Sequence, residues 1–194
     1  MMTTKPPFAL LEPRIPGPAA AAVAAASGAV VRLSLGAVPD RRSVVDGGWW
    51  PRSYDAAAEL PGLIAAVDDR LDKATVRVGL SVTAWTNVPH MLPVSARIVP
   101  VWRYGSLDPL LVSLTLAKDE TIELLVIPPD TPAATANNAL ALSPASRGRI
   151  HPADILTIAN DLALAELRQQ HRNDQATRED EAGGQPTPAP RRDD

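Results

Sequence analysis

Alternating apolar and polar residues mark five segments of the chain as strands. The clearest is 75–83, where every second residue is apolar, a period typical of a strand with one buried face. The same alternation covers 31–35, 95–103 and 112–116. In 122–127, Ile122, Leu124 and Val126 face one way and Leu125 and Ile127 face the other, so this strand is expected to be buried on both faces. The pattern predicts a sheet of about five strands.

A proline inside one run and the loop between two others indicate how the strands are arranged in the sheet. Pro100 interrupts the run 95–103, and proline cannot donate to a strand ladder, so this strand is expected at a sheet edge or with a bulge. Lys118-Asp119-Glu120 separates the last two runs, and its length suits a hairpin loop. These two strands are therefore predicted to be antiparallel neighbours, and the sheet to be mainly antiparallel.

Apolar residues with a helical period predict two or three helices. An amphipathic stripe covers 60–71, with Ser53 as a possible N-cap, and Pro61 either kinks this helix or starts a second one. An alanine-rich helix is expected at about 132–142 and another at about 152–168. The strands and helices together predict an α+β fold in which the helices cover one face of the sheet.

The two ends of the chain differ in composition from its middle. Residues 1–28 are rich in proline and alanine and are predicted to be a disordered leader, with a cleaved signal peptide as the alternative. Residues 173–194 carry six acids against three arginines and no periodic apolar residues, which predicts a disordered acidic tail. A single α+β domain is therefore expected over 29–172.

Charge and cysteine content narrow the classes of function. The net charge is −3, unlike the basic surface of a nucleic-acid binder. The absence of cysteine excludes disulfides and thiolate chemistry. No apolar run reaches the roughly 20 residues of a membrane-spanning helix. We expect a cytoplasmic protein whose partner is an unknown small molecule or protein, with neither nucleic acid nor membrane as a partner; an oligomer is possible.

The segment Asp46–Ser53, Asp-Gly-Gly-Trp-Trp-Pro-Arg-Ser, is the strongest candidate for a site. In one interpretation its tryptophans form the walls of a pocket in which Arg52 stacks on an indole ring or binds a carboxylate or phosphate. In the other, one tryptophan fills the core and Arg52 pairs with Asp46 or a backbone carbonyl. The candidate ligand-binding residues are Asp46, Trp49, Trp50, Arg52 and Trp85.

An enzyme would need further residues. His90 lies in a loop and is a possible acid or base. Asp130, in Pro-Pro-Asp-Thr-Pro, is either a ligand at a helix N-terminus or part of a capped turn. The enzyme hypothesis requires Asp46, Arg52 and His90 or Asp130 to lie in one cleft. Metal-ligand spacings, phosphate loops and nucleophile motifs do not occur in the sequence, so we predict no catalytic residues, metal or cofactor.

Several short motifs give the chain a resemblance to a known family. They are Arg32–Leu35, Asp46–Ser53, Glu59–Pro61, Val82–Trp85 and Val126–Pro132. Together they resemble a family of uncharacterised actinobacterial proteins, known as a domain of unknown function, over roughly residues 30–142. The resemblance implies an intracellular bacterial protein and transfers no catalytic residue.

Three functions are consistent with these patterns. The first is a small binding or regulatory domain that uses the Asp46–Ser53 segment. The second is an enzyme of unrecognised type, and the third is a structural or homodimeric assembly protein.

Overall fold

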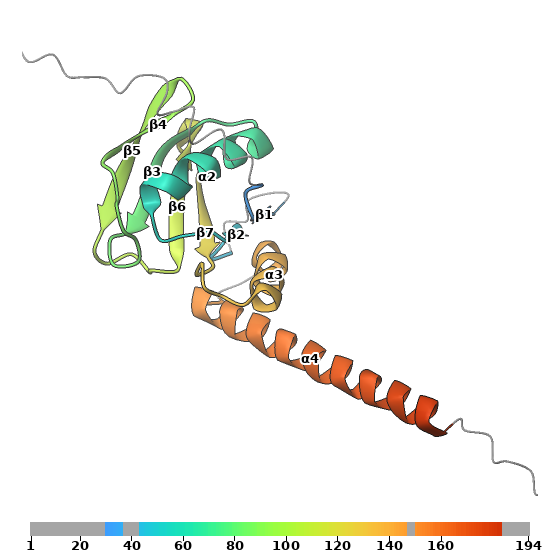
Figure 1. The fold of residues 1–194 in the computed structure, drawn as a ribbon. Coiled ribbons are helices and arrows are strands. Elements are labelled where there is room, and N and C mark those ends of the chain that lie inside the picture. The colour runs from blue at the N-terminus through green and yellow to red at the C-terminus, as the bar shows by residue number, and fades with distance from the viewer. Residues whose placement is uncertain (1–29, 37–42, 147–149, 184–194) are drawn as a thin grey trace, which may run out of the picture.

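The computed structural model describes residues 30–36, 43–146 and 150–183 (Figure 1). The leader 1–28 and the end of the tail, 184–194, lie outside the described residues. The described part is an α+β fold, as the sequence predicts. The strands are β1 (Leu33–Leu35), β2 (Gly47–Trp49), β3 (Thr75–Ser81), β4 (Met91–Val94), β5 (Arg97–Tyr104), β6 (Leu111–Leu116) and β7 (Thr121–Val126), and the helices are α2 (Ala56–Leu71), α3 (Ala133–Leu142) and α4 (Pro152–Gly183).

The described strands form one mixed sheet of seven in the order β1-β2-β7-β6-β3-β5-β4. The β2–β7 and β3–β5 pairs are parallel and the other four pairs are antiparallel. The β6–β7 hairpin is as predicted. The expected count of about five strands is too low because β2 contains two glycines and β4 contains Pro93, and both strands are too short to show alternation.

Helices cover both faces of the sheet, not one as we expected. On one face α2 packs through Leu60, Ile64 and other apolar residues against the inward side chains of the strands. On the other face α3 and the start of α4 pack on Leu125 and neighbouring residues. β7 allows both layers, because Leu124 and Leu125 point to opposite faces and each is fully buried.

Asp55 begins α2 and Asp68 attaches its end to the sheet. The carboxylate of Asp55, not the expected Ser53, is the N-cap, and it accepts a hydrogen bond from the Ala58 amide at 3.1 Å. Asp68 accepts hydrogen bonds from the amide and hydroxyl of Thr75, both at 2.7 Å, and pairs with Arg97. These contacts connect the last turn of the helix to β3 and β5.

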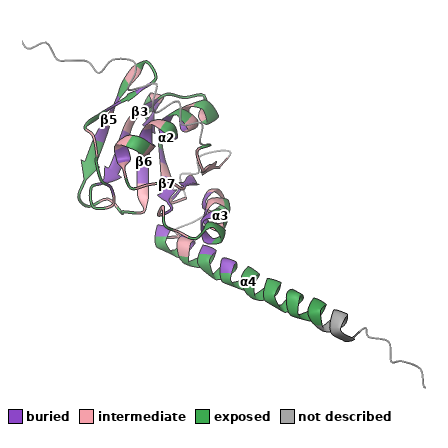
Figure 2. Cartoon of the chain, in the orientation of Figure 1, coloured by how far each residue is buried: buried purple, intermediate pink, exposed green. Residues whose placement is uncertain are grey.

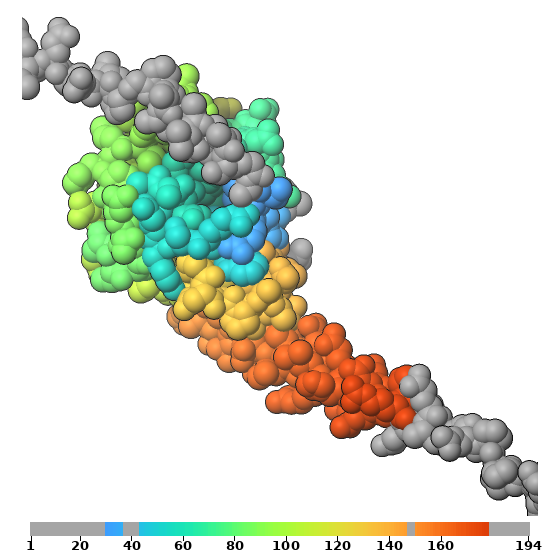
Figure 3. Space-filling model, viewed as in Figure 1, coloured from blue at the N-terminus to red at the C-terminus, as the bar shows by residue number. Residues whose placement is uncertain are grey.

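The last helix, α4, projects from the body (Figures 1 and 3). Its buried side chains all lie at its start, with Ala163 the last of them. From Leu164 to Arg178 every side chain is exposed (Figure 2). The helix passes Arg168, where we expected it to end, so residues 173–183 of the expected disordered tail are helical.

None of the helices in the described part of the chain combines the length and the apolar character that a membrane crossing needs.

Candidate functional site

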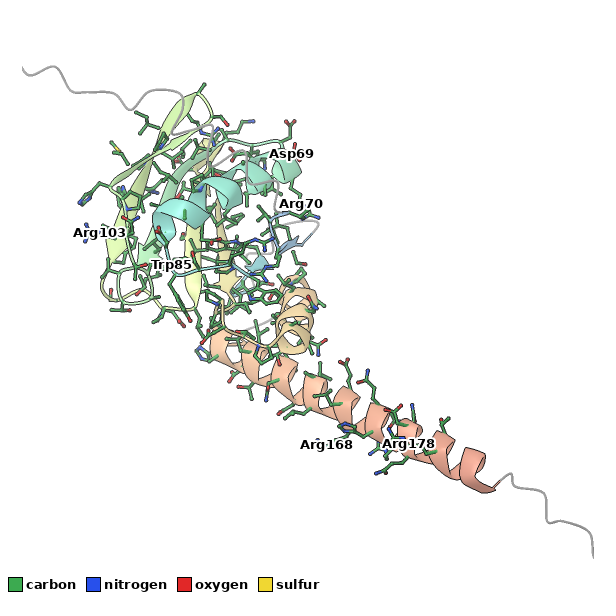
Figure 4. All side chains as sticks on the ribbon, viewed as in Figure 1. Asp69, Arg70, Trp85, Arg103, Arg168 and Arg178 are labelled. Atoms are coloured by element: carbon green, nitrogen blue, oxygen red, sulfur yellow. The ribbon has the colours of Figure 1, made fainter. Side chains whose placement is uncertain are left out.

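Trp49 and Trp85 lie in the core between α2 and the sheet. Their exposed fractions are 2% and 6%. The two rings stack with centroids 5.2 Å apart and an interplanar angle of 13°. Figure 4 shows Trp85 within the body of the domain. These two candidate residues are therefore part of the core that holds α2 on the sheet.

Trp50 stacks with an arginine, but the arginine is Arg32. The Arg32 guanidinium lies 3.5 Å from the centroid of the Trp50 ring. It also donates to the carbonyls of Trp50 at 3.0 Å and Pro51 at 2.5 Å. Arg52 is exposed and donates to the Val30 carbonyl at 3.4 Å. The expected stack of Arg52 on a tryptophan is therefore wrong, because the pairing of β1 with β2 places Arg32, not Arg52, on the Trp50 ring.

The two glycines of the segment are explained by lack of space for a side chain. A Cβ at Gly47 would lie 2.2 Å from the Ser34 carbonyl oxygen, on β1. A Cβ at Gly48 would lie 2.6 Å from the hydroxyl of Ser143, which follows α3. β2 is therefore a close-packed strand between β1 and the second helical layer.

His90 and Asp130, the residues of the enzyme hypothesis, have different partners in the fold. The His90 ring nitrogen Nε2 lies 3.0 Å from Nη1 of Arg103, which projects from the outer part of the sheet (Figure 4). Asp130 accepts a hydrogen bond from the Tyr54 hydroxyl at 2.9 Å. The hydrogen bonds of His90 and Asp130 among the described residues therefore lead to Arg103 and Tyr54, and not to Asp46 or Arg52.

Among the described residues, no helix packs on the sheet face away from α2 over β3, β5 and most of β6. Val99 and Val101 point towards α2, so Trp102 and Tyr104 point outward, and their exposed fractions are 48% and 39%. Figure 2 shows that much of β5 is exposed. The Trp102 and Tyr104 ring centroids are 6.3 Å apart. Two large exposed aromatic rings on one strand are unusual in a chain with few aromatic residues.

A pocket of about 280 Å³ lies beside these rings, and we call it the Glu123 pocket. Ser113 and Glu123 are directly opposite each other on β6 and β7. The Tyr104 ring approaches Gly79, where an added Cβ would lie 3.0 Å from its Cε2 atom. Ser113 and Glu123, which the strand register places side by side, thus form the base of the pocket, and Tyr104 forms one side. The lining residues are Tyr104, Ser106, Leu107, Ser113 and Glu123.

The surroundings of Glu123 raise the pKa of its carboxyl group. Burial raises the pKa of its carboxyl group, the Asp46 charge raises it further, and a hydrogen bond from Ser113 acts in the opposite direction. The Oε2 atom is shielded from solvent and has no hydrogen-bond partner among the described residues. Asp46 is held close because its Oδ2 accepts from the Glu123 amide at 2.9 Å. Asp46 is thus the one predicted site residue with a direct contact to the lining of this pocket.

Sequence reasoning missed Glu123, although the chain carried a signal. It is the one charged residue within the strand Thr-Ile-Glu-Leu-Leu-Val, and a charge inside an apolar strand is costly unless it is paired. The pocket places a carboxyl group, two serine hydroxyls and an aromatic ring around one space. Such a set can accept hydrogen bonds from a ligand or exchange a proton with it. Among the described residues there is no cluster of three or more potential metal ligands.

These features define an α+β domain with an acidic pocket on an open sheet face. Residues 32–143 match the family described as Family of unknown function (DUF5994), and the chain belongs to this family. The match covers the whole sheet, α2, α3 and every residue of the Glu123 pocket, and it ends before α4. No curated protein and no solved structure matches the chain.

Proposed function

We propose that this domain is a binding module that takes a small ligand in the Glu123 pocket. The observation that supports it most is the Glu123 carboxyl group, which has a shielded oxygen without a partner in a pocket beside exposed aromatic rings. Carboxyl groups with perturbed pKa values in clefts concentrate at functional sites. An aromatic surface with a few convergent polar groups is the usual composition of a ligand site.

The proposal gives the Asp46–Ser53 segment a supporting role. Trp49 stacks in the core and Arg32 covers Trp50, so this segment fixes β2 beside β7. Asp46 then acts on the pocket through the backbone and carboxyl group of Glu123. An intracellular location in an actinobacterium is also part of the proposal, and it rests on the resemblance of this segment.

An enzyme is the second candidate, and one observation favours it. Glu123 and Asp46 are neighbouring acidic residues, and the pKa of Glu123 is raised; pairs of carboxyl groups divide the roles of acid and base in many hydrolases. In this alternative Glu123 is the proton donor. Turnover of a bound compound, lost in Glu123→Gln, would favour the enzyme over the binding module.

Ligand binding in the pocket can be tested with small aromatic fragments and nuclear magnetic resonance of the tryptophan indole N–H groups. We expect fragments to shift the Trp102 signal and to leave those of buried Trp49 and Trp85 unchanged. Tyr104→Ala should abolish the shifts, because it removes one side of the pocket.

The matched control is His90→Ala, which removes an exposed ring near β5 that does not line the pocket. It should bind the fragments as the parent does. Fragments that never move the Trp102 signal, or that bind equally well to Tyr104→Ala, would contradict the proposed function.

A further inference from the structure

We infer that the Glu123 pocket selects a small organic cation, with an ammonium group directed at the Glu123 carboxyl group. This inference rests on the proposed function and names its ligand class. The charge of the lining, the positions of the basic groups on the same face and the aromatic ring carry it.

Among the described residues, the lining of the pocket contains an acid and no basic residue. Its polar groups are the hydroxyls of Tyr104, Ser106 and Ser113 and the carboxyl group of Glu123. Asp46 adds a second carboxylate next to Glu123. An anion would be repelled by the Glu123 charge, and a neutral ligand would not neutralise it. A cation would provide the opposite charge that a partly buried carboxylate requires.

The arginine on the same face is already engaged. Arg77 lies on β3, and its guanidinium donates to the Thr115 hydroxyl at 3.2 and 3.3 Å. The same group lies 4.4 Å from the centroid of the Trp102 ring. These contacts hold it along the open face, on Thr115 and Trp102, neither of which lines the pocket. In the described part of the chain, Arg77 is the arginine on this face and it does not pair with Glu123, so a ligand cation can take that position.

The aromatic side of the pocket suits the same ligand. Cations are attracted to the faces of tyrosine and tryptophan rings. Tyr104 lines the pocket and Trp102 adjoins it, with ring centroids 6.3 Å apart. A volume of about 280 Å³ lies at the small end of ligand sites. A single amine on a small apolar group fits this space and chemistry.

Three probes of nearly equal shape separate the possibilities: benzylammonium, benzyl alcohol and benzoate. They share one ring and differ in charge. Affinities are measured from the Trp102 indole shift at about pH 8, above the ordinary range of a carboxyl pKa. We expect benzylammonium to bind the parent roughly tenfold more tightly than benzyl alcohol, the ratio typical of one charge-assisted hydrogen bond. Benzoate should bind most weakly.

Two variants with the same loss of charge identify the group responsible. Glu123→Gln should reduce the preference for the cation to about twofold or less, because it removes the charge and keeps the shape. Asp69→Asn removes a carboxylate from exposed Asp69 on α2, over the other face of the sheet (Figure 4). It should keep the full preference. An equal loss in both variants would mean that only net charge matters and would overturn the inference.

A further variant keeps the test decisive if Glu123→Gln fails to fold. Tyr104→Leu retains the carboxylate and removes the ring, so benzylammonium should bind more weakly than it does to the parent. Unchanged affinity in Tyr104→Leu would overturn the inference. Equal or tighter binding of benzyl alcohol or benzoate to the parent would also overturn it and leave the proposed function intact. Failure of all three probes to move Trp102 would contradict both.

Discussion

Glu123 is a carboxyl group whose surroundings oppose its charge, with the Ser113 hydroxyl as the exception. Its pKa in the folded state lies above the ordinary value of 4.5. The folded protein therefore binds the Glu123 proton more tightly than the unfolded chain does. Linkage requires that stability decreases as the pH rises from about 4.5 through the folded pKa. A group of this kind is better explained by a ligand than by stability.

Glu123→Gln should therefore stabilise the domain at neutral pH, because the amide has no charge to desolvate. The parent should lose stability relative to the variant as the pH increases from about 4.5 towards neutrality. Urea unfolding of both proteins at several pH values would measure this. A parent that gains stability relative to Glu123→Gln with increasing pH would contradict the assignment.

Arg32 and Arg52 are predicted to differ in their effect on folding. Arg32→Ala removes a stack on Trp50 and two hydrogen bonds to carbonyls, so the free energy of unfolding should fall by about 1–2 kcal/mol. Arg52→Ala removes one long hydrogen bond from an exposed side chain and should change it by less than about 0.5 kcal/mol. Chemical denaturation measures both, and a larger loss for Arg52→Ala would contradict this account.

At the scale of elements, the sequence predicted the strands whose own pattern is strong. β3 and β6 alternate over most of their seven and six residues, and β7 alternates from Thr121 to Leu124 before its apolar residues become consecutive. β2 and β4 have three and four residues, so their pairing partners, not their own patterns, determine them. The consecutive apolar residues of β7 predicted burial on both faces, which already required a second helical layer. That layer was missed because the count of helices does not indicate which face each one covers.

The candidate site was only partly predictable, because the pocket is formed by residues that the pairing of distant strands brings together. Rare residues drew attention to Asp46–Ser53, and this segment does contain an arginine–tryptophan stack, completed by Arg32. The Glu123 pocket depends on Ser113 lying opposite Glu123 and on Tyr104 lying over Gly79. Pairings between distant strands are set by the assembled sheet, so composition and local periodicity could not reveal them.

The projecting part of α4 is predicted to be dispensable for folding. Truncation after Arg168 removes only exposed side chains among the described residues, so the free energy of unfolding should stay within about 0.5 kcal/mol of the parent. Urea denaturation followed by tryptophan fluorescence would measure it. Ala159→Asp, at a fully buried position of the same helix, is the control and should cost about 2 kcal/mol or more. A large loss on truncation would contradict the prediction.

At the scale of the whole molecule, the family match and the compact body nearly coincide. The matched residues 32–143 hold the sheet, both helices that follow its strands, and the pocket. Binding at the pocket should therefore be a property of this part of the chain. α4 lies beyond the match and carries Arg168 and Arg178 clear of the body (Figure 4). Homodimeric assembly stays a prediction, which the mass from light scattering would test.

The projecting helix also determines how the protein moves through solution. With 32 residues and about 1.5 Å of rise per residue, α4 is about 48 Å long. Its last 20 residues, from Leu164 to Gly183, project from the body over about 30 Å, and a rod of this length increases the friction of the molecule and makes its tumbling anisotropic. A monomer should consequently elute early from a sizing column and sediment slowly for its mass. Early elution alone would therefore report the shape of this molecule, not the number of chains.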